Sequence, residues 1–313
     1  MGYAFDPELA PWVSMLPTLD HTDIAAARAA LRELAAQKPG SELPADVTVR
    51  ELTIPGPPGD PEVPVRVYAP TGRTGKLPAL VYIHGGGFIV GDLDTFHFET
   101  AMIASEVGAV VISVDYRLAP EHPFPAGLED CYAALKWTHE QAAELGVDVT
   151  RIGVGGESAG GGLSAAVALL ARDRGGPALC FQLLGIPELD DRLETPSMVA
   201  FTDTPLWNQP AAVQSWKYYL GELNTELDIA YAAPARAADL SGLPPAYVTT
   251  CEFDPLRDEG LSYAQRLVQA GVSVEIHHYP GTFHGSALVT EAAVSKRMLA
   301  DQLGALRRGL HAT

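Results

Sequence analysis

A glycine-flanked serine is the strongest chemical signal in the sequence. Ser158 stands within the run Gly-Glu-Ser-Ala-Gly at 156–160, directly after the β-like segment 151–155 and directly before a helix-like segment. A Gly-x-Ser-x-Gly run between a strand and a helix is typical of a nucleophile elbow, in which a strained turn exposes the serine hydroxyl. A glycine-rich turn without chemistry is the alternative, and the surrounding pattern favours a nucleophile.

The same segment partly matches Gly-x-Gly-x-x-Gly, the loop that binds dinucleotides. Ser158 occupies the position of the third glycine, and the preceding strand is not the first in the chain. An acidic residue suited to the ribose does not clearly follow it. The sequence therefore favours the nucleophile elbow over a dinucleotide site, and we expect no cofactor.

A serine nucleophile needs a base and a group that orients the base, and after a nucleophile elbow these follow in the order acid, then histidine. Asp254 comes just after the β-like segment 246–250, and His284 lies in a glycine-flanked loop after the segment 272–279. We therefore predict Asp254 as the acid and His284 as the base.

Other acidic and histidine side chains lie near these two, namely Glu252, Asp258, His277 and His278. Glu252 is closer to the strand, and Asp258 falls in the next predicted helix, where it would cap the helix or pair with Arg257. Both histidines lie inside the strand pattern, which favours packing or surface roles over catalysis.

A glycine run follows the β-like segment 79–83. Backbone N–H groups of glycine can point freely into a crevice, and a developing oxyanion requires such donors. We predict that the oxyanion hole consists of Gly86, Gly87 and the N–H of Ala159. His84, which precedes the glycines, is expected to brace the loop.

Short apolar runs separated by helix-length segments would position these residues. Such runs are typical of strands buried on both faces of a parallel sheet, and six follow Pro78: 79–83, 109–114, 151–155, 178–186, 246–250 and 272–279. Two alternating segments, 47–54 and 63–69, precede them and predict an antiparallel pair at one edge. We therefore predict an α/β fold with a mostly parallel, eight-stranded sheet flanked by helices.

Composition restricts the class of partner. The chain has 21 basic and 39 acidic residues, a formal charge of −18, and such a surface repels phosphate backbones and anionic membranes. The three cysteines show no zinc-like spacing, and we expect buried thiols in a reducing compartment. With no signal-like start and no long apolar run, we expect a cytoplasmic protein without nucleic-acid or membrane partners.

Taken together, several motifs resemble the hormone-sensitive-lipase family of α/β-hydrolases, in its bacterial branch. They are His-Gly-Gly-Gly at 84–87, Val-Asp-Tyr-Arg-Leu-Ala-Pro-Glu at 114–121, Gly-Glu-Ser-Ala-Gly-Gly at 156–161, Asp-Pro-Leu-Arg-Asp at 254–258 and Phe-His-Gly at 283–285. One departure is Glu157, since many members carry aspartate before the nucleophile. Tyr116, Arg117 and Glu121 are expected to brace the loop under the oxyanion turn.

The resemblance implies an α/β-hydrolase fold with a helical cap. The alanine-rich run from Thr22 to about Gln37 predicts a helix ahead of the sheet, and the strand-free insertion contains one predicted helix, Gln209–Leu220. We predict an N-terminal cap segment at 1–45, a cap insertion at 188–238, and a catalytic domain at 46–187 and 239–313. Candidate pocket walls, for which core packing is the alternative, are Phe88, Leu206, Trp207 and Tyr219.

The resemblance also implies a serine carboxylesterase that acts on small-molecule esters with short acyl chains, and a homodimer is the family-level expectation. An amidase or formamidase would use the same acyl-enzyme and remains an alternative. A non-catalytic ligand receptor on this scaffold would lack the base, so the presence of His284 disfavours it.

Overall fold

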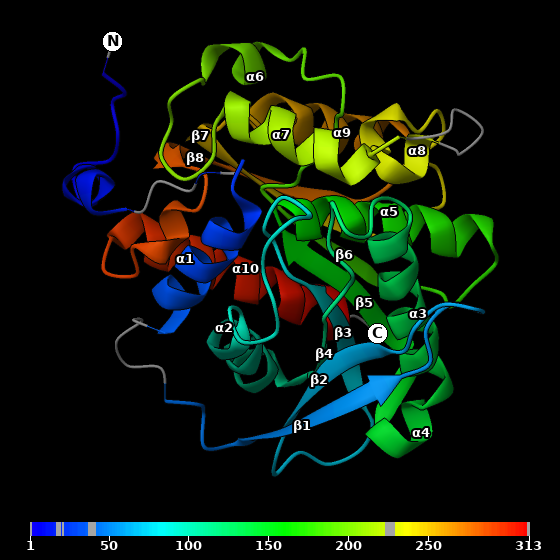
Figure 1. The fold of residues 1–313 in the computed structure, drawn as a ribbon. Coiled ribbons are helices and arrows are strands. Elements are labelled where there is room, and N and C mark those ends of the chain that lie inside the picture. Colours follow the sequence, from blue (N-terminus) through cyan, green and yellow to red (C-terminus); the bar gives the residue numbers. More distant parts are fainter. Residues whose placement is uncertain (1, 17–19, 21, 37–41, 223–228, 312–313) are drawn as a thin grey trace.

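One eight-stranded sheet organises the molecule (Figure 1). The computed structural model describes residues 2–16, 20, 22–36, 42–222 and 229–311 of the chain. The strand order is β1-β2-β4-β3-β5-β6-β7-β8. Their bounds are Val47–Ile54, Val63–Pro70, Leu77–Ile83, Val110–Val114, Val147–Glu157, Phe181–Gly185, Ala246–Phe253 and Val274–Phe283 for β1 to β8 in chain order.

The pairing of the strands matches the sequence-based prediction. β1 and β2 form an antiparallel pair at one edge, and β2 also runs antiparallel to β4. All other neighbours are parallel. The prediction of an α/β fold with a mostly parallel, eight-stranded sheet is therefore confirmed.

Helices cover both faces of the sheet because most of its strands are apolar on both sides. One face packs against α2 (His97–Ile103), the short π-helix η2 (Ala104–Gly108) and α10 (Ala293–His311). The other face packs against α3 (Ala126–Glu140), α5 (Ala159–Asp173) and α9 (Arg257–Gln269). Successive residues of β3 alternate between the two cores, with Leu80 and Tyr82 in the first and Val81 and Ile83 in the second.

The segments outside the alternating pattern form short helices near one end of the sheet (Figure 1). The N-terminal part contains η1 (Ala10–Met15) and α1 (Ile24–Ala36). The predicted end of the latter helix near Gln37 lies outside the described residues. Between β6 and β7 lie α6 (Pro196–Ala200), α7 (Gln209–Leu220), α8 (Ile229–Ala232) and the 3-10 turn η3 (Pro234–Arg236).

The bounds of α7 coincide with the helix predicted from the sequence. The Asn208 side chain accepts a hydrogen bond from the N–H of Ala211 and caps the helix, and Gly221 ends it with a positive φ of 53°. The prediction of a single helix in the insertion was incomplete. The other helices there have only three to five residues, too few to show a helical period.

The remaining helical elements are α4 (Ala142–Leu145) and η4 (Ser286–Leu288). None of the helices in the described ranges combines the length and the apolar character that a membrane crossing requires. All three cysteines are free; Cys131 and Cys251 are buried and Cys180 is half-buried.

The parallel strands bring four chain segments to the same end of the sheet, where the carboxyl ends of the strands lie. β3 ends before His84, β5 before Ser158, β7 before Asp254 and β8 before His284. Because β3, β5, β6, β7 and β8 all run in the same direction, these segments emerge at the same end.

The end of β3 lies against the turn that joins β5 to α5. A methyl group added to Gly156 or to Gly160 would lie 2.0 Å from the carbonyl oxygen of Ile83. Only a bare backbone permits this approach, so these glycines are required by packing.

Replacing Gly160 by alanine is therefore expected to destabilise the protein by about 1–3 kcal/mol or more, because a backbone carbonyl cannot move aside. Urea unfolding followed by circular dichroism measures this change. Gly304→Ala in α10 is the matched control, since its methyl group would meet only the flexible end of Arg308. The control should be neutral or stabilising by up to about 1 kcal/mol. Equal stabilities of the two variants would contradict the packing argument.

Candidate active site

Ser158 occupies a strained position at the start of α5. Its φ of 58° and ψ of −123° are unusual for a residue with a side chain. Its own N–H donates to the carbonyl of Gly185, which ties the turn to β6. The surrounding contacts maintain this strained backbone conformation. The Ser158 hydroxyl therefore lies at the first turn of a buried helix.

Ser158, His284 and Asp254 form a continuous hydrogen-bonded chain. His284 Nε2 lies 3.0 Å from Ser158 Oγ, and His284 Nδ1 lies 2.8 Å from Asp254 Oδ2. Only 7%, 7% and 1% of these three residues are exposed, respectively. The second oxygen of Asp254 accepts from the N–H of Leu256. Since the carboxylate accepts, Nδ1 carries the proton and Nε2 is free to accept from the serine.

The structure places the competing acids elsewhere. Glu252 accepts a hydrogen bond from the N–H of Gly281, and Asp258 accepts from the N–H of Ser197 and pairs with Arg257. Both therefore support loops of the site without reaching the histidine.

The competing histidines also have other partners. His277 lies between the carboxylates of Glu275 and Asp301, and His278 contacts the hydroxyl of Thr250. Neither forms a hydrogen bond with Ser158, so among the histidines that the structure describes, only His284 bonds to the nucleophile.

The glycine run after β3 lies beside the nucleophile. A methyl group on Gly85 would lie 3.4 Å from Ser158 Cβ, and Gly86 has a φ of 121° that favours glycine. A methyl group on Gly87 would lie 2.5 Å from the ring of Trp207. The N–H of Ala159 lies in the first turn of α5, where helix N–H groups have no partner within the helix. The glycine run and the first turn of α5 therefore lie side by side.

His84 is packed beneath this run. Its ring stacks between Tyr116 and Phe96, with ring centroids 4.3 Å and 5.7 Å away. Its Nδ1 donates to the carbonyl of Gly85, and Tyr116 donates to the carbonyl of His84 itself. Burial lowers the pKa of His84 to about 4, so the ring is neutral. These contacts agree with a bracing role for His84 and Tyr116.

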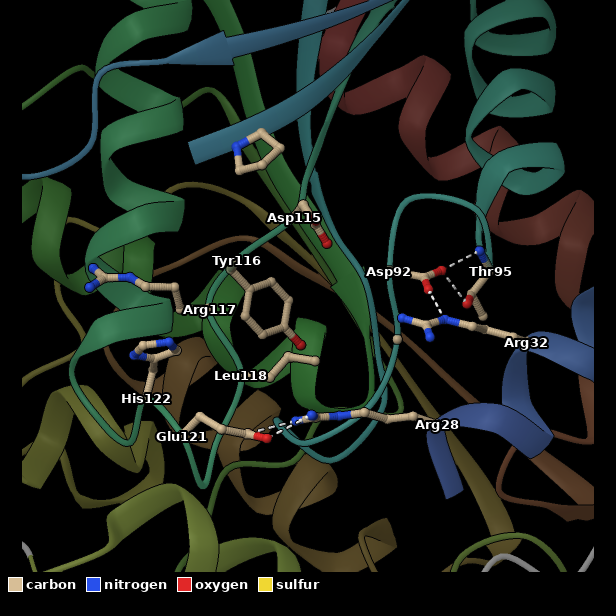
Figure 2. A pocket seen from close by; sticks show the side chains of 12 residues that line it. Arg28, Arg32, Asp92, Thr95, Asp115, Tyr116, Arg117, Leu118, Glu121 and His122 are labelled. Atoms are coloured by element: carbon tan, nitrogen blue, oxygen red, sulfur yellow. Dashed lines mark hydrogen bonds and ion pairs between the residues drawn. The ribbon is translucent and has the colours of Figure 1, made fainter. Parts of the chain in front are cut away.

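A polar cavity of about 480 Å³ lies behind this loop (Figure 2). Arg28, from α1, reaches it and donates to the carbonyls of Ile89 and Ala119. The same guanidinium forms two 2.8 Å hydrogen bonds with Glu121. Arg117 is held by Asp130 and Asp60 at the other side. The N-terminal helix is therefore fastened directly to the segment that carries the glycine run.

The four candidate pocket residues differ in position. The ring of Trp207 lies 5.8 Å from that of His284, and Leu206 approaches Gly285, where its Cδ1 would lie 3.0 Å from an added methyl group. Phe88 and Tyr219 instead stack on one another at 3.9 Å and are buried in the core. Trp207 and Leu206 thus adjoin the site, and Phe88 with Tyr219 supports the loop from behind.

The N-terminal segment makes a contribution that sequence analysis missed. Phe5 packs against Phe253 and Phe283, at 5.4 Å and 5.1 Å between ring centroids. These two rings directly precede Asp254 and His284. Tyr3 also contacts Phe253 and hydrogen-bonds to Asp203, which joins this segment to the loop before α7. No local pattern marks such pairing, because the partners lie about 250 residues apart in the chain.

Within the described ranges, no group of three or more His, Cys, Asp or Glu side chains is arranged to hold a metal ion.

Comparison with known proteins identifies the family of this fold. The family model described as "alpha/beta hydrolase fold" matches residues 80–288. The chain belongs to this family. Carboxylesterase NlhH of Mycobacterium tuberculosis (strain ATCC 25618 / H37Rv) is 44% identical over 317 residues, covering 98% of each chain.

Solved structures give the same result. The structure named bacterial heroin esterase has a TM-score of 0.96 and 53% identity, and it covers 99% of each chain. A thermostable esterase from Pseudomonas putida ECU1011 has a TM-score of 0.91 and 33% identity, covering 99% of this chain and 98% of its own. The predicted resemblance to the hormone-sensitive-lipase family and the predicted class of enzyme, a carboxylic ester hydrolase, are confirmed.

Removing the ring of Phe5 is expected to loosen both loops that follow its aromatic partners. Phe5→Ala should lower kcat for a p-nitrophenyl ester roughly tenfold, since small displacements of reacting groups are costly. Phe5→Leu keeps most of the apolar volume and is the control, expected to retain most of the rate. A folded Phe5→Ala protein with wild-type kcat would show that the segment does not hold the loops.

Proposed function

We propose that this chain is a serine carboxylesterase that hydrolyses short-chain acyl esters through an acyl-enzyme. The observation that carries the proposal is the hydrogen-bonded chain from Ser158 through His284 to Asp254. A hydrogen-bonded serine, histidine and aspartate in this order activate the serine hydroxyl for attack on a carbonyl carbon.

In the first half-reaction, His284 Nε2 takes the proton from Ser158 as Oγ attacks the ester carbonyl. Asp254 keeps Nδ1 protonated and stabilises the imidazolium that forms. The histidine then gives its proton to the leaving alcohol as the C–O bond breaks, and the acyl group stays on the serine. Water completes the cycle, because the same base removes its proton and returns it to Ser158 when the acid is released.

The negative oxygen formed in both half-reactions needs donors. Gly86, Gly87 and Ala159 are the proposed source, since their backbone N–H groups lie on two segments beside the nucleophile. The dipole of α5 adds partial positive charge at the same place.

The cap accounts for the proposed preference for small substrates. We assign the N-terminal segment and the 188–238 insertion to a cap over the site, because α1 bonds to Ile89, just after the glycine run, and α7 bonds to Gly87 within it. Trp207 lies next to His284 and Leu206 next to Gly285, and we propose that these two side chains limit the length of the acyl chain. The predicted cytoplasmic location and homodimer stay predictions.

Replacing Ser158 by alanine should lower kcat by at least about 10⁴-fold, since the nucleophile is lost. Steady-state hydrolysis of p-nitrophenyl acetate measures the change. Mass spectrometry after rapid quenching should find one acetyl group on the wild-type peptide that contains Ser158, and none on the variant. Full turnover by Ser158→Ala would exclude the proposed mechanism.

Two substrate series separate esterase from amidase and short from long acyl chains. With p-nitrophenyl esters from acetate to laurate, kcat/KM should be greatest for a short chain; a maximum at ten carbons or more contradicts the pocket argument.

With a matched acetyl ester and acetanilide, the ester should react faster, and a faster anilide would favour the amidase alternative. A neutral ester should also be preferred over a succinyl ester, given the charge of −18.

A further inference from the structure

A buried carboxyl group that takes no part in the steps above lies behind the glycine run. Glu188, in the loop after β6, is completely buried. Its Oε1 lies 3.2 Å from the Oγ of Ser215 on α7, and its Oε2 has no hydrogen-bond partner among the described residues. A buried carboxylate with an unpartnered oxygen would be strongly disfavoured, whereas a neutral carboxyl group is tolerated.

The hydrogen bonds of Ser215 define the proton arrangement. Its Oγ lies 2.7 Å from the carbonyl oxygen of Gly87. A hydroxyl has one proton and a carbonyl only accepts, so Ser215 donates to Gly87. The contact with Glu188 is then a hydrogen bond only if the carboxyl group is protonated and donates to Ser215. The geometry therefore describes a relay from Glu188 through Ser215 to Gly87.

The same loop is also fastened to the nucleophile. The N–H of Glu188 donates to the carbonyl of Ser158 at 3.1 Å. Glu259 on α9 accepts from the N–H groups of Leu189 and Asp190, at 2.6 Å and 3.2 Å, and holds the loop from the far side. Glu188 thus connects the turn that carries the nucleophile with the turn that carries the proposed oxyanion donors.

We infer that Glu188 and Ser215 are positioning residues, which hold the oxyanion turn in its active geometry only while Glu188 is protonated. The inference rests on the proposed acyl-enzyme route. When Glu188 ionises, it can only accept. The single proton of Ser215 is then drawn to the carboxylate, and the carbonyl of Gly87 loses its donor. The enzyme therefore carries an alkaline limit that is separate from the histidine.

The surroundings of Glu188 place this ionisation near the upper end of the physiological range. Burial raises the pKa of Glu188 to about 8, the hydrogen bond with Ser215 opposes the rise, and the negative Asp254 adds to it. Asp254 is itself paired with His284. The other titratable groups that interact with Glu188 are Glu259, Tyr116 and Tyr219. Carboxyl and phenol groups carry no positive charge, so these three neighbours do not stabilise the ionised form of Glu188.

The first test removes the relay at its centre. Ser215→Ala should lower kcat for p-nitrophenyl acetate by about 10- to 100-fold at pH 7, while KM changes less than about threefold. The effect falls on kcat because the oxyanion exists only in the transition states and the intermediates between them. A folded Ser215→Ala protein with wild-type kcat would overturn the inference.

The second test uses the pH profile, which a merely structural role would not change. Wild-type kcat/KM should fall as pH rises through about 8, and Glu188→Gln, which still donates but cannot ionise, should retain most of the rate at pH 7 and lack this fall. Glu259→Gln is the matched control, because it changes a neighbouring buried carboxyl outside the relay. An alkaline fall that persists in Glu188→Gln, or that disappears in Glu259→Gln, would overturn the inference.

The third test does not depend on activity. Glu188 is protonated in the folded protein up to about pH 8 but ionises in the unfolded chain above about 4.5, so folding stability should decline as pH rises between these values. Comparing melting temperatures at pH 5 and pH 8, Glu188→Gln should lose less than the wild type; an equal loss would show that the carboxyl is not held protonated. The same melting temperatures can be compared in proteins that also carry Ser158→Ala. Turnover by Ser158→Ala would contradict the acyl-enzyme route, whereas an equal loss of melting temperature would contradict the relay, so the two failures can be distinguished.

Discussion

The close approach of β3 to the turn between β5 and α5 is the constraint on which the site depends. The Ile83 carbonyl lies where a side chain on Gly156 or Gly160 would have to be, so only glycine permits the contact. Because the chain continues directly from Ile83 into the glycine run, this contact sets how far the proposed oxyanion donors lie from Ser158. The strained backbone of Ser158 persists because β3, β6 and α5 hold it from three sides.

Most of the fold could be predicted from the sequence, because it follows from local patterns. Strands buried on both faces appear as continuous apolar runs, and parallel pairing then brings their ends to one edge. Ser158, Asp254 and His284 could be proposed for that reason, as each follows such a run. The ends of two strands were predicted less accurately. β5 extends to Glu157 and β8 to Phe283, beyond the runs 151–155 and 272–279, because both strands continue through polar residues and glycine.

What could not be predicted are contacts between distant segments. Nothing near Phe5 indicates that it meets Phe283, and nothing near Ser215 indicates that its hydroxyl faces Gly87. Neither contact has a periodicity or a motif, because each depends on how the connections are folded over the end of the sheet. Glu188 is a further case, since an acidic residue in a loop after a strand is ordinarily solvated and its burial is apparent only in the structure.

These distant contacts suggest a second role for the proposed cap. A cap that only covered the substrate would need to contact the rim of the site, yet both of its parts bond to the backbone of the glycine run or its continuation. Arg28 holds Ile89 from the N-terminal side, and Ser215 holds Gly87 from the insertion. Since Gly87 and Ile89 are two residues apart, a shift of either cap segment would move the proposed oxyanion donors. If the proposed cap and oxyanion donors act as we infer, substrate enclosure and stabilisation of the oxyanion are mechanically coupled, and changes to the cap are expected to alter kcat as well as substrate choice.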